Sequence, residues 1–389
     1  GEKKDGKMKF AAASAQSPRQ VRTVNNSVKA RWGAVLATAL LAGGMSPAVA
    51  ADTTTPAPTP SASTAATTGA ATPTPSASTG ATTGAATPSA VASATPATAG
   101  FPNLLDSQVE RIAASVAAVV ASGDNAKNAK ELAPRVAGMA LNVRTANYKI
   151  RAKVDKQAAV EPVSATKLLA RVVTTNRTWP RSAMLVTQGK DNSLPQLLTL
   201  VQASPRENYK LIHATPLLPG QTFPTVDKEG TEAVALDSAT DLKMSPKAAI
   251  SALSDRLTNA DSKFKDSFND SVYISSVLDL QKKVVADAKD ATNVFSHKGD
   301  LGSALAMRTA DGGAMVVVGN DFAIDATSKE AATLTVGADA AVFTGGKETT
   351  KGFTLHYAEP VVMYIPPTGV PAKITILSAT RSLVGGTFK

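Results

Sequence analysis

From residue 101 onward, the apolar residues follow first a helical period and then a strand period. A stripe with spacings of three and four predicts an amphipathic helix that uses Leu105, Val109, Ile112, Val116 and Val119. Gly123 predicts the end of this helix. A second helical stripe begins near Pro134 and uses Val136, Met139 and Val143.

After Ala158 the pattern changes to short apolar, β-branched runs that are separated by turn residues. These runs predict four strands, at residues 168–175, 183–188, 196–202 and 209–218. The breaks between them are Trp179-Pro180 and the polar stretches 190–193 and 204–208. Helices followed by strands predict an α+β domain with an antiparallel sheet.

The same order recurs in the second half of the chain. Ser245 is expected to cap a helix that starts at Pro246, because serine before proline is typical of helix N-termini. The stripes of this helix and of the next one are Ile250, Leu253 and Leu257, and then Val277, Leu280, Val284 and Ala288. Strands are predicted at residues 304–309, 314–324, 332–336, 341–344, 353–365 and 372–377, with a hairpin turn at Asp311-Gly312-Gly313.

A short internal match supports a duplication. Residues 209–216 and 353–360 align without gaps and share a leucine, an alanine and a proline. Together with the repeated order of helices and strands, this match predicts two tandem α+β domains, at residues 101–240 and 241–389.

A leader is predicted at residues 1–50. A basic stretch precedes the apolar run 32–45, and Ala48-Val49-Ala50 then forms the small-x-small pattern that signal peptidase recognises. Cleavage is therefore expected between Ala50 and Ala51. The run is 14 residues long, whereas a membrane anchor needs about 20, so an uncleaved anchor is the less favoured alternative. Gly44 stands where a lipoprotein would carry its cysteine, and the chain has no cysteine, which excludes that lipid attachment.

Residues 51–100 are expected to form a disordered stalk. They consist almost entirely of Thr, Ala, Pro, Ser and Gly, which bury too little apolar surface to offset the entropy of ordering. A 15-residue unit at 59–73 is repeated at 74–88 with 14 identical positions. It has no hydrophobic face, so it predicts a spacer and not a solenoid. A spacer that holds a domain off the cell surface and a neutral low-complexity expansion both fit this composition.

The charge of the chain changes its meaning once the leader is set aside. Residues 1–50 carry eight Lys and Arg against two Asp and Glu, so most of the net charge of +10 lies there. The remaining surplus is small for more than 300 residues and does not indicate a nucleic-acid partner. Without disulfides, the exported part must be stable through its core alone.

Candidate catalytic and metal-binding residues are few. The chain has three histidines, His213, His297 and His356, and their spacing predicts no metal site. Ser-x-x-Lys occurs at 164–167 and 262–265, but the other elements of penicillin-binding enzymes are absent. Gly345-Gly346-Lys347 lacks the spacing of a phosphate-binding loop and is expected to be a hairpin loop. We therefore assign no catalytic or ligand-binding residue and expect no cofactor.

Three stretches resemble an uncharacterised family of secreted proteins and lipoproteins from actinobacteria. They are residues 204–220, 307–314 and 374–384, and the resemblance extends over about 106–385. It implies that helices pack on a curved sheet in each half, similar to the cone-shaped fold of nuclear transport factor and ketosteroid isomerase. The family carries no activity that can be transferred to this chain.

The concave face of such a sheet often forms a pocket. Strand alternation predicts that Tyr209 and His213 share one face with Leu211, and that Tyr357 and Glu359 share one face in the second half. A histidine or carboxylate there could act as a general base, but half-buried sheet residues are the simpler interpretation. Trp179 is likewise interpreted as a packing or turn residue.

The sequence therefore predicts an exported cell-envelope or extracellular protein, a non-catalytic binding module whose partner is an envelope protein, a lipid or a wall component. Export is expected to be of the Sec type, and membrane contact is expected only through an uncleaved signal. The alternative is a small-molecule enzyme of isomerase or cyclase type, with its pocket in one cone-like sheet.

Overall fold

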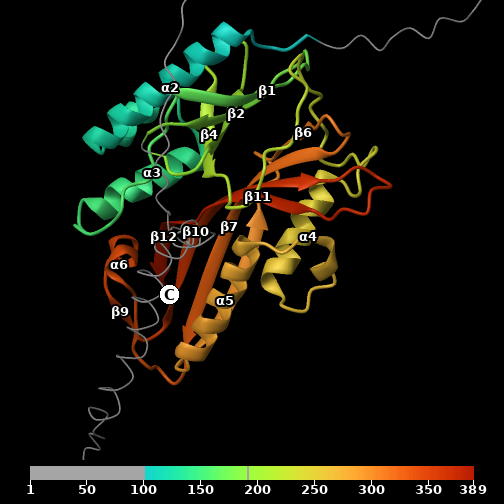
Figure 1. The fold of residues 1–389 in the computed structure, drawn as a ribbon. Coiled ribbons are helices and arrows are strands. Elements are labelled where there is room, and N and C mark those ends of the chain that lie inside the picture. Colours follow the sequence, from blue (N-terminus) through green and yellow to red (C-terminus); the bar gives the residue numbers. More distant parts are fainter. Residues whose placement is uncertain (1–100, 191) are drawn as a thin grey trace, which may run out of the picture. The chain divides into compact units, whose positions relative to one another are not determined.

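A computed structural model describes residues 101–190 and 192–389 (Figure 1). The predicted leader, the stalk and the cleavage site at Ala50 and Ala51 lie outside these residues. Within them, helices and antiparallel strands form the chain, which confirms the predicted mixture of helix and antiparallel sheet. Among the helices of the described ranges, none has both the length and the apolar character needed to cross a membrane.

Two long helices and four strands form the first half of the described chain. In chain order they are α2 (Asp106–Ala126), the short η1 (Ala129–Leu132), α3 (Gly138–Arg151), β1 (Lys167–Val173), β2 (Arg181–Gln188), β3 (Gln196–Gln202) and β4 (Lys210–Pro216). The strands pair antiparallel in the order β1-β2-β3-β4. All four lie where the alternation pattern predicts them.

Helix α2 does not end at Gly123, and this prediction was wrong. The helix continues to Ala126, and Lys127 ends it in the left-handed conformation with φ 51°. A Cβ at Gly123 would lie 2.4 Å from Cδ2 of Leu132, which packs from η1. Gly123 therefore allows two segments to approach closely instead of stopping the helix.

Helix α3 begins at Gly138 and not near Pro134. Val136 forms a parallel bridge with Leu211 on β4. The backbone of Arg135 accepts a hydrogen bond from the amide of Leu211 at 2.8 Å, and Leu211 accepts one from Ala137 at 2.9 Å. Because these residues pair with a strand, they are not available to the helix.

The second half contains a larger sheet. Its elements are α4 (Pro246–Thr258), η2 (Lys265–Ser267), α5 (Val272–Asp287), β5 (Ala291–Gly299), β6 (Leu305–Arg308), β7 (Ala314–Ser328), β8 (Leu334–Thr335), α6 (Ala338–Thr344), β9 (Glu348–Thr349), β10 (Gly352–Ile365), β11 (Thr375–Ala379) and β12 (Ser382–Phe388). Ser245 caps α4 through a hydrogen bond from the amide of Ala248 at 3.1 Å, as predicted. Asp311 accepts a hydrogen bond from the amide of Gly313 at 3.0 Å and closes the predicted turn between β6 and β7.

Strands β7 and β10 form the centre of the six-stranded sheet and pair along the whole length of β10. Each of them is flanked by two shorter strands that share its free edge. β6 and β5 pair with successive parts of β7, and β12 and β11 pair with successive parts of β10. Both outer edges are interrupted at the same level, opposite Gly319 on β7 and Pro360 on β10.

Three segments differ from the predicted elements. Residues 341–344 belong to helix α6 and not to a strand, because Gly345 caps a single short helix in the left-handed conformation. Short apolar runs do not distinguish strand from helix by periodicity alone. Strands β5 and β12 were not predicted, since β5 carries polar residues on its exposed side and β12 contains two glycines.

Apolar clusters define the order of the layers in the described chain (Figure 1). One cluster joins α2 and α3 to one face of the four-stranded sheet, a second joins the two sheets, and a third joins the six-stranded sheet to α4 and α5. Buried members are, in that order, Val116 and Leu185, Met184 and Val317, and Leu253 and Val361. We call the second one the inter-sheet cluster. The packing order is thus helix, sheet, sheet, helix.

Candidate functional site

The three histidines lie in three different environments. His297 on β5 contacts a buried glutamate near α5. His213 on β4 packs against β7 between the two sheets. His356 on β10 is partly exposed and contacts an aspartate on β7. Each environment offers different chemistry, and the first two are closed to solvent.

Glu359 is the centre of the first environment. It is fully buried on β10, where it pairs in register with Asn320 of β7. Tyr357, two residues earlier, packs against Phe322 with the ring centroids 5.8 Å apart. Tyr357 and Glu359 share one face of the strand, as predicted, and α5 covers this face.

The interruption of the sheet edge brings Arg381 to Glu359. β12 pairs with β10 up to Ala358, and β11 pairs with β10 from Val361, so the chain leaves the ladder at Thr380 and Arg381. Nε of Arg381 donates to Oε2 of Glu359 at 2.8 Å, and its Nη2 also donates to that oxygen. The pair is buried, with side-chain exposures of 2% and 0%.

His297 approaches the other carboxylate oxygen of Glu359. Its Nδ1 lies 3.8 Å from Oε1. Its Nε2 lies 2.6 Å from Oε1 of Gln281 on α5, whose Nε2 donates to the carbonyl of Leu257 at 2.8 Å. Because the amide nitrogen of Gln281 is used on α4, its oxygen accepts from Nε2–H of His297. The Nδ1 atom therefore faces the carboxylate.

Electrostatics hold this cluster in a charged state. Burial alone raises the pKa of Glu359, but the charge of Arg381 and the hydrogen bond from His297 outweigh it, and the pKa lies below its usual value. Burial, and then the charge of Glu359, hold the pKa of Tyr273 on α5 well above 10. Phe322 stacks on the His297 ring at 4.4 Å, and the Arg381 guanidinium lies 5.1 Å from the same ring.

We call these residues the ionic centre: Tyr273, Gln281, His297, Asn320, Glu359 and Arg381. Within the described chain, the Tyr273 hydroxyl and both ends of the Asn320 amide make no hydrogen bond. The ionic centre is enclosed, and its carboxylate is already paired. This arrangement joins α5, the sheet and the turn after β11, and its carboxylate could accept a proton only from a group that reaches the interior.

His213 does not share a face with Tyr209 and Leu211, so that prediction was wrong. The pairing of β3 and β4 shifts between Thr199 and Leu200, so Ile212 is an extra residue on β4. This bulge turns His213 away from the helices and toward β7. The ring is 2% exposed, and neither ring nitrogen has a hydrogen-bond partner among the described residues. Burial lowers its pKa to about 4, although the charge of Asp300 opposes this shift.

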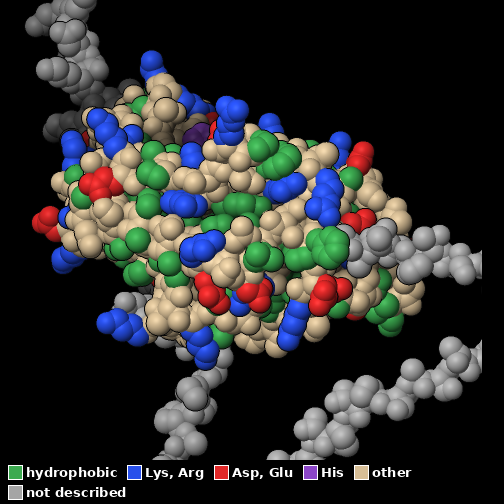
Figure 2. Space-filling view, turned by 90° about the horizontal axis from the view of Figure 1, so that it is seen from above, with side chains coloured by type: hydrophobic (Ala, Val, Ile, Leu, Met, Phe, Trp, Pro, Cys, Tyr) green, Lys and Arg blue, Asp and Glu red, His purple; other side chains and the backbone are tan. Residues whose placement is uncertain are grey.

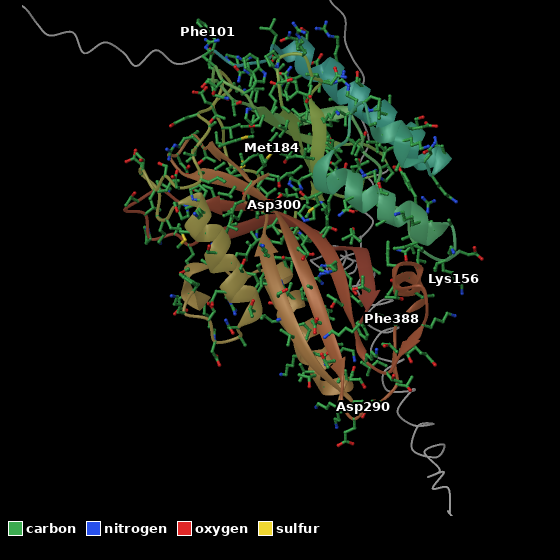
Figure 3. All side chains as sticks on the ribbon, turned by 180° about the vertical axis from the view of Figure 1, so that it is seen from behind. Phe101, Lys156, Met184, Asp290, Asp300 and Phe388 are labelled. Carbon is green, nitrogen blue, oxygen red and sulfur yellow. The ribbon has the colours of Figure 1, made fainter. Side chains whose placement is uncertain are left out.

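His356 belongs to an exposed polar surface of the six-stranded sheet. Its Nδ1 lies 3.1 Å from both carboxylate oxygens of Asp321, with side-chain exposures of 43% and 49%. Asp325 accepts hydrogen bonds from Thr354 at 3.0 Å and from Lys389 at 2.6 Å on the same side. Figure 3 shows these strands between the labelled Asp300 and Asp290, with no helix in front of them.

We call this surface the open face. Its members are Thr292, Val294, Ser296, Lys298, Asp321, Asp325, Thr354, His356 and Lys389. Except for Val294, every member carries a hydrogen-bonding or charged group. The ladder fixes the spacing of the side chains, and their mutual hydrogen bonds fix several orientations.

The remaining candidates of the sequence have structural contacts. Ser262 donates its hydrogen bond to Asp255 rather than to Lys265. Gly345 caps α6. Trp179, before a cis bond to Pro180, donates to Gln202 at 3.0 Å, and the Arg181 guanidinium lies 3.8 Å from its ring centroid. In the described ranges, no group of three His, Asp or Glu side chains is placed to hold a metal ion.

Sequence reasoning missed Arg381, Tyr273 and Asn320 as partners of Glu359. One signal was present, because a proline inside a long strand indicates that pairing is interrupted on one edge, and Pro360 directly follows Glu359. The interrupted edge is where Arg381 enters. Nothing in the pattern identifies Tyr273 among the apolar residues of α5.

Comparison with known proteins yields one match. The model of a domain of unknown function, DUF8094, matches residues 124–385. Searches of curated proteins and of solved structures find no match. The matched region ends where the expected resemblance ends and covers both sheets with the ionic centre. The chain therefore belongs to the family of this domain of unknown function.

Proposed function

We propose that this protein is an exported cell-envelope or extracellular binding module, which contacts its partner through the open face. The observation that carries this proposal is the pre-ordered set of polar side chains around His356 and Asp321, which are exposed and held 3.1 Å apart. Residues on a rigid strand lose little entropy on binding, which favours a recognition role.

The composition of the open face favours a polar polymer of the cell wall over a lipid. Hydroxyls, two carboxylates, two ammonium groups and an imidazole offer both donors and acceptors, as a polymer rich in hydroxyl and amide groups requires. Val294 is its exposed large hydrophobic residue, at 59%. A surface that inserts into lipid needs a larger apolar area.

Co-sedimentation with insoluble cell-wall material tests this proposal. The full chain is expected to pellet with the wall material and to remain in the supernatant with lipid vesicles. The double variant Asp321→Ala, His356→Ala should lose most of this binding. The matched control removes an exposed pair on α5, Lys283→Ala with Asp287→Ala, and should bind as the unchanged chain does. Equal binding by both variants, or binding to vesicles alone, contradicts the proposal.

Export is proposed on the leader pattern alone. Mass spectrometry of culture supernatant and envelope fractions tests it. A chain that begins at Ala51 in the supernatant supports cleaved export. A chain that retains Trp32 in the envelope shows instead that the apolar run stays as an anchor.

The ionic centre favours one alternative, a small-molecule enzyme of isomerase or cyclase type. A buried carboxylate beside His297 and Tyr273, on a sheet covered by helices, has the groups that such chemistry needs. Glu359 is fully enclosed, so a substrate enters only if α5 separates from the sheet. Hydrogen exchange of α5 tests this alternative: amides that exchange as slowly as those of β7 count against it, and fast exchange confined to α5 favours it.

A further inference from the structure

The surroundings of His213 have the chemistry of a metal-ion ligand site. The imidazole is buried in the described chain and both of its nitrogens lack a hydrogen-bond partner. Buried polar atoms without partners are uncommon in folded proteins, and each one calls for an explanation such as a bound ion. Its pKa of about 4 means that the ring is neutral at neutral pH, with a free lone pair.

A thioether packs beside this ring. Gly319 on β7 has no side chain, and the space where its Cβ would lie is occupied from two sides. The Sδ atom of Met139 lies 3.0 Å from that point, and Cε1 of His213, the carbon between the two ring nitrogens, lies 3.1 Å from it. The imidazole of β4 and the thioether of α3 therefore meet over the same glycine.

A negative charge lies close to the same place. The amide of Asp300 donates to the carbonyl of Gly319 at 2.9 Å, and the charge of Asp300 acts on His213. The carboxylate is fixed in its loop by the Gly302 amide at 3.0 Å and by the Ser303 hydroxyl at 2.6 Å. Figure 3 places Asp300 at the level where the two sheets approach each other, below Met184.

We propose that His213 and Met139 form a binding site for a soft monovalent metal ion, with Cu(I) as the expected ion. Thioether and imidazole ligands together select Cu(I) over Ca²⁺ and Mg²⁺, which prefer oxygen ligands. Two neutral ligands leave one positive charge on the ion, which the nearby Asp300 compensates. Met139 is only partly buried and Asp300 is exposed, so the ion has a path from the surface.

Competition with a chromophoric Cu(I) chelator under anaerobic, reducing conditions tests the site in the full chain. The unchanged chain is expected to withdraw copper from the chelator. Met139→Leu should lose this uptake in part or completely, because leucine fills a similar volume without a sulfur ligand. Met184→Leu is the matched control. Met184 also belongs to the inter-sheet cluster, but Thr199 on β3 separates it from His213.

A second readout keeps the test decisive if a variant folds poorly. An ion that binds only the folded chain raises its melting temperature, so Cu(I) should raise the Tm of the unchanged chain and of Met184→Leu, but not of Met139→Leu. Zn²⁺ at the same concentration should have the smaller effect. The proposal is overturned if the unchanged chain takes up no copper, or if Met139→Leu takes up as much as Met184→Leu.

Discussion

Glu359 is the residue whose environment the rest of the chain must preserve, since its charge is buried and compensated mainly by Arg381. Replacing Arg381 with leucine leaves an uncompensated carboxylate in the interior. We expect Arg381→Leu to lower the free energy of unfolding by about 3–5 kcal/mol, measured by urea denaturation.

An exposed pair provides the control for this substitution. Lys283 and Asp287 pair on α5 with about one third of each side chain exposed, so Lys283→Ala should cost at most about 0.5 kcal/mol. If Arg381→Leu costs no more than Lys283→Ala, Glu359 does not depend on Arg381 for its charge, and the account of the ionic centre fails.

His213 makes the stability of the fold depend on pH. Its folded-state pKa of about 4 lies below the ordinary value of 6.5, so the unfolded chain takes up the proton first as the pH falls. This residue therefore contributes stability above pH 6.5 and loses it as the pH falls from 6.5 to 4. The difference amounts to about 3 kcal/mol.

Urea denaturation at several pH values between 7 and 4 measures this loss. His213→Leu should show a shallower decline over that range than the unchanged chain. The exposed His356→Ala variant should keep the decline of the unchanged chain. Identical slopes for all three chains would show that His213 is not the titrating group.

At the scale of elements, Gly123 decides how closely η1 approaches α2. In an exposed helix, glycine to alanine stabilises by about 1 kcal/mol. Here the new Cβ would lie 2.4 Å from Leu132 and 3.3 Å from the Tyr148 hydroxyl, so we expect Gly123→Ala to destabilise by about 1–3 kcal/mol instead. The sign of the change in melting temperature is the test, and a higher value would contradict the close packing.

The elements also show what local pattern can and cannot predict. β1 to β4, α4 and the turn at Asp311 follow from alternation, capping and turn residues, because these signals act over a few neighbouring residues. The bulge at Ile212 and the entry of Arg381 depend on pairing between strands that are distant in sequence. A single shifted register turned His213 to the other face, and no local pattern reports such a shift.

The ionic centre was predicted only in part for the same reason. Tyr357 and Glu359 share a face, which follows from strand alternation alone. Their partners come from α5, β5, β7 and the turn after β11, so the site exists only after the sheet and helix have packed.

At the scale of the whole molecule, the inter-sheet cluster joins the two halves of the described chain. Met315 on β7 is fully buried in it, and Met184 and Val172 contribute from the other sheet. Figure 2 shows apolar side chains in small patches among Lys, Arg and polar residues on one surface of the molecule. The more extensive apolar packing is therefore internal.

Met315→Ala tests whether this packing couples the halves. We expect it to cost about 2–5 kcal/mol and to shift one unfolding transition, seen alike by far-UV circular dichroism and by Trp179 fluorescence in the first half. A shift confined to one of two separate transitions would show that the halves unfold independently.

Recognition through the open face is the central claim. Carbodiimide labelling of carboxylates, read by mass spectrometry, reports it directly when wall material is present. The account predicts that Asp321 and Asp325 become protected, while Asp106 and Glu110 on α2 are labelled as before. Unchanged labelling of Asp321 and Asp325 in the bound protein would contradict it.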